Sequence, residues 1–198
     1  MEETVLTEIQ KPKRKKKMIF IGILALVLIA AGIFGWIKYQ EKKKQDYAKL
    51  QAETIVDMRV SFLMATLIVG SYSDVWDNAI DNGNDFNVAI SEFKSSIEDN
   101  ALKDRKDEQE SIKENMKLLQ NPPENYTESY NVLKEMYGTY ARIMEQAESP
   151  SGSLIEFNKN VNELYSDFEE KVEQLDITLP SDVKKIKEDM EKEKTTEN

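Results

Sequence analysis

The chain contains neither cysteine nor histidine in its 198 residues. Without cysteine it forms no disulfide framework, thiolate nucleophile or Cys-ligated zinc site. Without histidine it lacks the commonest general base and the commonest transition-metal ligand. No convergent carboxylate pair or glycine-rich loop takes their place. The sequence therefore predicts a protein that is not an enzyme and that holds no cofactor or metal ion.

Positive charge is scarce over most of the chain. Residues 45–198 contain 17 Lys and Arg against 33 Asp and Glu, a net charge of −16, whereas the whole chain carries −10. An acidic surface of this size repels nucleic-acid phosphates and anionic lipid headgroups. We therefore expect no nucleic acid among the partners, whereas basic partners and cations are compatible with this surface.

Residues 18–37, by contrast, contain no charged or strongly polar side chain and read MIFIGILALVLIAAGIFGWI. A helix of this length rises about 30 Å, the thickness of the hydrocarbon core of a bilayer. Trp36 and Tyr39 lie at its end, where aromatic rings favour the membrane interface. A cleaved signal peptide has an apolar stretch of only about 7–15 residues followed by a small-x-small site. The sequence therefore predicts a single-pass helix retained in the lipid bilayer.

Basic residues flank this segment on both sides. Residues 1–17 hold six of them, and four follow the segment as Lys38, Lys42, Lys43 and Lys44. The topology signal is the run of Lys13, Arg14, Lys15, Lys16 and Lys17. Because the more basic flank stays in the cytoplasm, residues 1–17 are predicted to be a cytoplasmic tail. The part of the chain after the helix is then extracytoplasmic at the cell membrane.

The remainder of the chain predicts an all-α fold, an antiparallel bundle of about four helices within residues 38–180. The first helix covers roughly 40–80 and the second 86–119, with the apolar stripe Phe86, Ile90, Phe93, Ile97 and Ala101. Asn121-Pro122-Pro123-Glu124 is expected to open the third, with Asn121 as N-cap, and Ser153-Leu154-Ile155-Glu156 the fourth, through a capping box. Residues 181–198 are expected to form a short helix at 182–192 and a disordered acidic tail.

The third helix carries a seam of apolar residues that alternates spacings of four and three, as in a coiled coil. Its aromatic members are Tyr126, Tyr130, Tyr137 and Tyr140. Tyrosine at this spacing is typical of a packed core, but its polar tip also suits contacts with a partner. These four tyrosines are therefore the candidate partner-binding residues.

Two further segments have alternative interpretations. Residues 62–69 are nearly all apolar, which fits either a membrane-dipping element or, preferably, a central helix contacted on several sides, since the run is too short to span a bilayer. Asp81, Asp85 and Glu92 match positions one, five and twelve of a calcium loop. Phe86 stands where that loop requires glycine, so we expect no calcium there.

These features favour a membrane-anchored extracytoplasmic module that binds another protein of the cell envelope. One alternative is a small-ligand sensor that signals through a partner, because the predicted tail of 17 residues leaves no room for a signalling domain. The other is a phage or mobile-element protein that structures the envelope or excludes incoming DNA. A homo-oligomer is a further alternative, since Ala31 and Gly35 form a small-x-x-x-small pair in the membrane segment.

Overall fold

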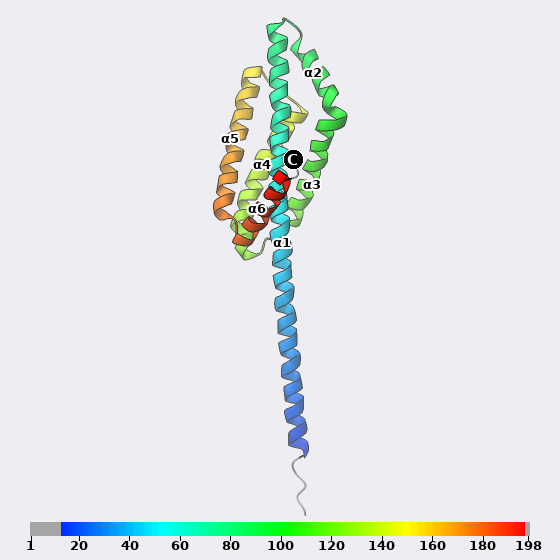
Figure 1. Cartoon of the computed structure of the whole chain (residues 1–198), viewed down its shortest axis with the longest axis vertical. Coiled ribbons are helices and arrows are strands. Elements are labelled where there is room, and N and C mark those ends of the chain that lie inside the picture. The colour runs from blue at the N-terminus through cyan, green and yellow to red at the C-terminus, as the bar shows by residue number, and fades with distance from the viewer. Residues whose placement is uncertain (1–12, 197–198) are drawn as a thin grey trace, which may run out of the picture. The chain divides into compact units, whose positions relative to one another are not determined.

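The computed structural model describes the backbone of residues 13–196 and the side chains of residues 24 and 26–193. This part of the chain is helical and contains no strand (Figure 1). Its α-helices are α1 (Lys13–Asp81), α2 (Phe86–Ile97), α3 (Lys103–Leu118), α4 (Thr127–Glu148), α5 (Leu154–Thr178) and α6 (Ser181–Thr196). The predicted all-α class, an N-terminal apolar helix followed by a helical bundle, is confirmed.

The chain divides into two compact units, Met1–Lys44 and Gln45–Asn198, and α1 contributes residues to both. In the first unit, the large apolar side chains that are described between residues 24 and 37 are all exposed. They are Leu24, Leu26, Val27, Leu28, Ile29, Ile33, Phe34, Trp36 and Ile37. These side chains bury themselves against no other part of the described chain.

One helix of the described chain is long and apolar enough to cross a membrane. It is the part of α1 from Leu26 to Asp81, whose most apolar 18-residue window has a mean hydropathy of 1.5. Of that window, 44% is buried, and the core helix of a soluble protein meets the same criterion. Length and composition are therefore compatible with a membrane span but do not show which part of α1 would cross the membrane.

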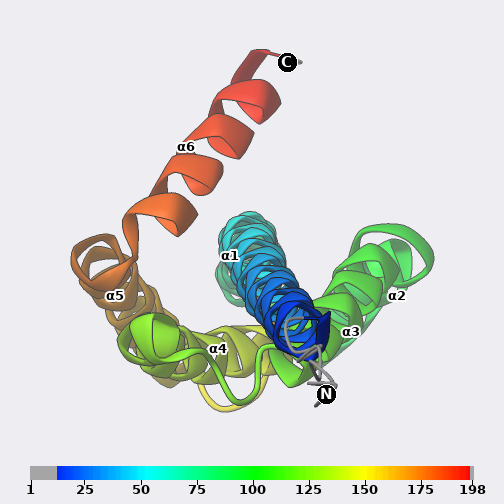
Figure 2. The same cartoon turned by 90° about the horizontal axis from the view of Figure 1, so that it is seen from below.

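In the second unit, α1 supplies the centre of the hydrophobic core. A series of its buried apolar residues recurs every three or four positions: Ala48, Ala52, Ile55, Met58, Phe62, Ala65, Val69, Tyr72, Trp76 and Ala79. In Figure 2 this helix lies between α2 and α3 on one side and α4 and α5 on the other, and α6 extends from the end of α5 along a third side. The antiparallel pairing expected for the two helices that follow the double proline is present as α4 against α5 (Figure 1).

The predicted second helix is interrupted by a π-helical turn, Glu98–Leu102, between α2 and α3. A π turn uses more residues than an α turn, and helices often bend at one. The apolar stripe accordingly passes from Ile97 to Leu102, five residues on, and Leu102 is fully buried. The predicted stripe was therefore wrong at Ala101, which is exposed.

The start of α4 also differs from the prediction. Asn121 is not the N-cap; its φ of 61° lies in the left-handed region, in the connection after α3. A single 3₁₀ turn, Glu124–Tyr126, follows, and α4 begins only at Thr127. Because a residue that precedes proline is disfavoured in the α conformation, neither Asn121 nor Pro122 begins the helix, and Pro123 is itself extended, with a ψ of 151°.

The predicted capping box of α5 is confirmed. The Ser153 hydroxyl accepts a hydrogen bond from the Glu156 amide, and the Glu156 side chain accepts one from the Ser153 amide. The last helix, α6, continues to Thr196, so the disorder predicted for residues 192–198 was wrong for the part that the structure describes. Lys192 lies 3.6 Å from Asp189, one turn back on the helix, which extends the pattern of i,i+3 pairs into this end.

Candidate functional site

The most distinctive surface of the bundle is a row of exposed apolar side chains on α1. Val60, Leu63, Met64 and Leu67 are 37%, 50%, 45% and 65% exposed, respectively. Their spacing of i, i+3, i+4 and i+7 places them on one face of the helix. We call these four residues the α1 stripe. Figures 1 and 2 show no other helix over α1 between α6 and the α2–α3 pair.

The opposite face of the same helical turns fixes how α1 is rotated. Phe62 is fully buried and stacks on Phe168 of α5, with ring centroids 3.7 Å apart and planes 4° apart. Ala65 and Val69 are also fully buried. Turning the α1 stripe inward would therefore expose Phe62 and break this stack. The predicted central helix is covered on only part of its circumference at residues 62–69.

A small cavity adjoins the lower end of the α1 stripe. It has a volume of about 220 Å³ and is lined by Asp57 and Val60 of α1 and by Glu108, Ser111 and Ile112 of α3. Arg105 forms an ion pair with Glu108 at 2.5 Å, so this acidic wall is partly neutralised. The cavity therefore has a mixed polar and apolar lining between Val60 and α3.

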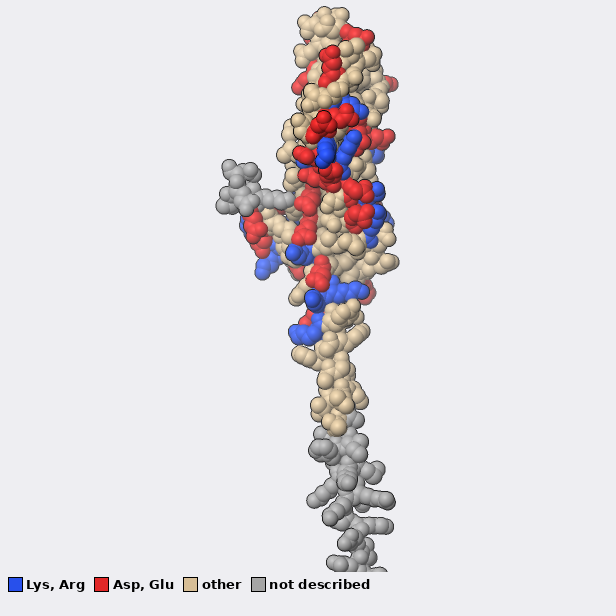
Figure 3. Space-filling view, turned by 90° about the vertical axis from the view of Figure 1, so that its right-hand side faces the viewer, with Lys and Arg blue, Asp and Glu red and all other residues tan. Residues whose placement is uncertain are grey.

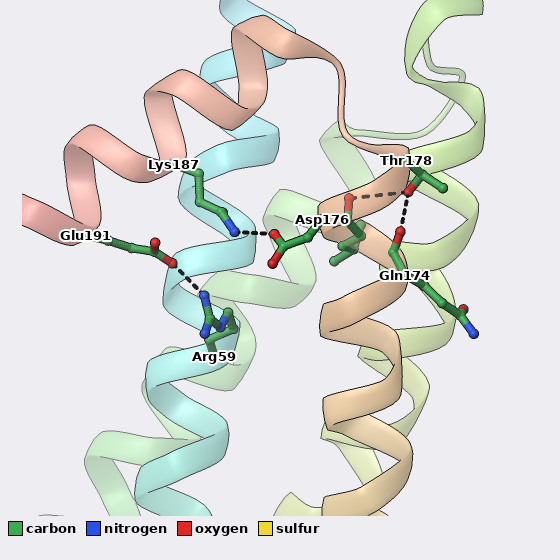
Figure 4. A network of polar contacts seen from close by, with 7 residues as sticks. Arg59, Gln174, Asp176, Thr178, Lys187 and Glu191 are labelled. Atoms are coloured by element: carbon green, nitrogen blue, oxygen red, sulfur yellow. Dashed lines mark hydrogen bonds and ion pairs between the residues drawn. The ribbon is translucent and has the colours of Figure 1, made fainter.

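Helix α6 is held beside α1 by buried and half-buried ion pairs (Figure 4). Arg59 of α1 lies 2.5 Å from Glu191 of α6. Lys187 of α6, which is 5% exposed, lies 2.5 Å from Asp176 of α5. A buried ammonium group is tolerated only when it is paired. These contacts fix α6 against both α1 and α5.

Toward its C-terminal end, α1 becomes acidic. Asp74, Asp77 and Asp81 are all exposed, and Asp74 and Asp81 follow Leu67 at successive steps of seven residues. We call these three residues the acidic end. The sequence contains no Lys or Arg between Arg59 and Lys94, and none of the described cations forms an ion pair with the acidic end. Figure 3 shows carboxylates without nearby Lys or Arg at the upper end of the bundle.

Two of the four predicted tyrosines are core residues. The Tyr126 hydroxyl donates a hydrogen bond to Asp182 of α6 at 2.6 Å, and burial raises the pKa of Tyr126 well above its usual range. The Tyr140 hydroxyl lies 3.0 Å from that of Ser61, and burial raises the pKa of Tyr140 to about 12. Both rings are buried, which agrees with the packed core that the spacing of the seam also indicates.

The other two tyrosines are half-buried. Tyr130 and Tyr137 pack against the hydrophobic core, and the Lys134 ammonium lies 5.9 Å from the centre of the Tyr130 ring. They belong to α4, whereas the exposed apolar surface belongs to α1. The all-round apolar run at 62–69 was the sequence signal for this surface, but it did not show which residues point outward.

The calcium-loop residues take another role. The Asp85 carboxylate caps α2 by accepting hydrogen bonds from the amides of Asn87 and Val88. Gly83 supplies the positive φ of the turn, 68°. Within the described residues no three acidic side chains are close enough together to hold a metal ion.

The predicted topology signal Lys13, Arg14, Lys15, Lys16 and Lys17 falls in the first turns of α1, but its side chains lie outside the described residues, as do residues 1–12 altogether. No protein-family model, curated protein or solved structure matches this chain.

Proposed function

We propose that this protein is a membrane-anchored binding protein of the cell envelope, without enzymatic activity. Residues 18–37 span the cell membrane, and the bundle binds another envelope protein through the α1 stripe. The observation that carries the proposal is the exposure of Val60, Leu63, Met64 and Leu67 on one helix face. Contiguous apolar patches on soluble surfaces typically mark interaction sites.

The anchor is supported by the exposed apolar side chains of the first unit, between residues 24 and 37. Each large aliphatic side chain that is left in water forgoes about 1.5–3 kcal/mol of burial free energy, so such a helix requires an apolar environment. The basic run 13–17 outnumbers the cations that follow the helix. It favours a cytoplasmic N-terminus and an extracytoplasmic bundle.

Binding of a protein explains the surface better than binding of a small ligand. The cavity beside Val60 has a volume of about 220 Å³, whereas small-molecule sites typically measure about 300–1,000 Å³. Its walls include Asp57 and Glu108, and the adjoining α1 stripe is an open helix face rather than an enclosed pocket. A helix face of this kind suits a protein surface or an amphipathic helix.

Site-specific photocrosslinking in the native host tests the proposal. A photoreactive residue replaces Leu63 or Leu67 in the α1 stripe, and in a matched control it replaces Ile177 of α5, which is 84% exposed. We expect one envelope protein to be captured at both stripe positions and not at Ile177. Equal capture at all three positions, or adducts of this chain with itself alone, would contradict the proposal.

The proposed topology has its own test, because the chain contains no cysteine of its own. Ile177→Cys is expected to react with a membrane-impermeable maleimide in intact cells. Thr7→Cys, in the N-terminal tail, is expected to react only after lysis. The reverse pattern would place the bundle in the cytoplasm.

A further inference from the structure

We propose that the α1 stripe and the acidic end together bind a basic amphipathic helix of a partner protein. This inference rests on the proposed binding function and specifies the chemistry of the partner. The relevant surface changes character along one helix face, from apolar at Val60–Leu67 to acidic at Asp74 and Asp81. A ligand that matches both parts must be apolar at one end and cationic at the other.

The spacing along α1 sets the pattern of that ligand. Leu67 and Asp74 are two helical turns apart, about 10 Å, and Asp81 lies about 10 Å further on. A helix lying along α1 therefore offers apolar residues at i, i+3, i+4 and i+7, followed by Lys or Arg about two and four turns beyond them. Its basic end meets carboxylates that have no ion pair within the described residues.

The lower end of the surface already has its charges balanced. Glu191 is paired with Arg59, and Glu108 is paired with Arg105, at 2.5 Å in both cases. A partner needs no cation there, and a charged group would be desolvated next to Val60 and Leu63. The carboxylates of the acidic end, in contrast, form no ion pair with any described cation, so the cationic half of the partner lies at that end.

A second copy of this chain is a poor occupant of the same surface. In a parallel pair of α1 helices, Asp74 and Asp81 would face the same residues of the other copy, and in an antiparallel pair the acidic end would face the other copy's α1 stripe. Like charges at facing positions destabilise a helix pair, and residues 45–198 of each copy carry a net charge of −16 in total.

Peptide binding to the full-length chain in phosphatidylcholine nanodiscs tests the inference. The probe is a designed helix of about three heptads with leucines in one half and lysines on the same face of the other half. The matched control peptide has glutamate in place of each lysine. Each peptide is made in two versions, one with the leucine half at its N-terminus and one with the leucine half at its C-terminus. The affinity of each is measured by fluorescence anisotropy at low and high salt.

We expect the lysine peptide to bind and Leu67→Gln to weaken binding about tenfold or more, because this residue is at the centre of the contact. Asp74→Asn/Asp81→Asn should weaken binding about threefold at low salt and reduce its salt dependence. Ile177→Gln, an equally conspicuous exposed residue on α5, should leave the affinity unchanged.

Equal affinity for the lysine and glutamate peptides, no effect of Leu67→Gln, or no binding of either peptide would overturn the inference. So would a disulfide dimer formed by Leu67→Cys and not by Ile177→Cys, since it would show a second copy on the stripe. The crosslinking experiment separates the two proposals. Capture of an envelope protein without a basic helix rejects this inference alone, whereas no specific capture at Leu63 or Leu67 rejects the binding function itself.

Discussion

The rotation of α1 within the bundle predicts a large difference between two apolar residues that lie little more than one turn apart. Phe62 is fully buried, and its ring stacks on Phe168, whereas Leu67 is 65% exposed. Truncating a buried phenylalanine removes its apolar contacts and leaves a cavity, at a cost of about 3–5 kcal/mol. Only about a third of the Leu67 side chain is covered, so Leu67→Ala should cost less than about 1 kcal/mol.

The assay is urea unfolding of the full-length chain in detergent micelles, followed by the fluorescence of Trp76. This tryptophan is 5% exposed and stacks on Phe86, so it reports on the bundle. Trp36→Phe removes the second tryptophan, which lies in the apolar segment. With a slope of about 2 kcal/mol per molar urea, Phe62→Ala should lower the midpoint by about 2 M, and Leu67→Ala by less than 0.5 M or so.

Equal shifts for the two variants would refute the assigned rotation of α1, and with it the α1 stripe. A double-mutant cycle of Phe62→Ala and Phe168→Ala isolates the stack itself. We expect a coupling of about 0.5–1.5 kcal/mol beyond the area that each ring buries. Additive losses would mean that the two rings are buried independently of each other.

Three smaller changes test local features of the bundle by the same unfolding assay. Ser153→Ala should cost about 1 kcal/mol at neutral pH by removing the side-chain cap of α5. Hydrogen bonds from the Ser153 amide and hydroxyl lower the pKa of Glu156, so the stability they contribute is present above pH 4.5 and lost as the pH falls through the lowered pKa. The variant retains the amide and loses the hydroxyl, so a fall in unfolding free energy at acid pH that equals that of the wild type would contradict the hydroxyl's hydrogen bond. Burial raises the pKa of Tyr140 to about 12, so the stability that its protonated hydroxyl contributes is fully present below pH 10 and lost between pH 10 and 12. Tyr140→Phe should therefore make the fall in unfolding free energy at alkaline pH shallower. An unchanged slope would contradict the burial of Tyr140. In Gly83→Ala the added Cβ has no other atom within 4 Å, but the alanine must adopt a φ of 68°, so backbone strain should lower the unfolding free energy by about 1 kcal/mol. Gly138→Ala, within a helix, should leave the unfolding free energy unchanged or raise it.

Local signals were sufficient for much of the fold. The capping box at Ser153 and Glu156 and the break between the helices predicted at 40–80 and 86–119 depend on residues close together in the chain, and both are present in the structure. The start of α4 was the exception. The pattern at Asn121 resembles an N-cap, but each proline disfavours the α conformation in the residue before it, so the helix does not begin at Pro122. A 3₁₀ turn at Glu124–Tyr126 comes first, and α4 begins at Thr127.

Burial of individual side chains required the tertiary structure. The seam on α4 predicted Tyr126, Tyr130, Tyr137 and Tyr140 as one set, yet two are buried and two are half-buried. The difference arises from neighbours distant in sequence, since Asp182 and Ser61 accommodate the hydroxyls of the buried pair. The π turn is another such case, because it moves the buried position from Ala101 to Leu102 without an evident signal in the sequence.

The sequence by itself determined the apolar segment at 18–37, the helical class, the acidic character of residues 45–198 and most helix boundaries, because each depends on composition or on contacts between close neighbours in the chain. Only the tertiary structure decided which residues of 62–69 are exposed. A helix that is apolar on all sides has no preferred face of its own, so its rotation is set by the helices packed against it. Here the stacking of Phe62 on Phe168 makes that choice and leaves Leu63, Met64 and Leu67 on the surface.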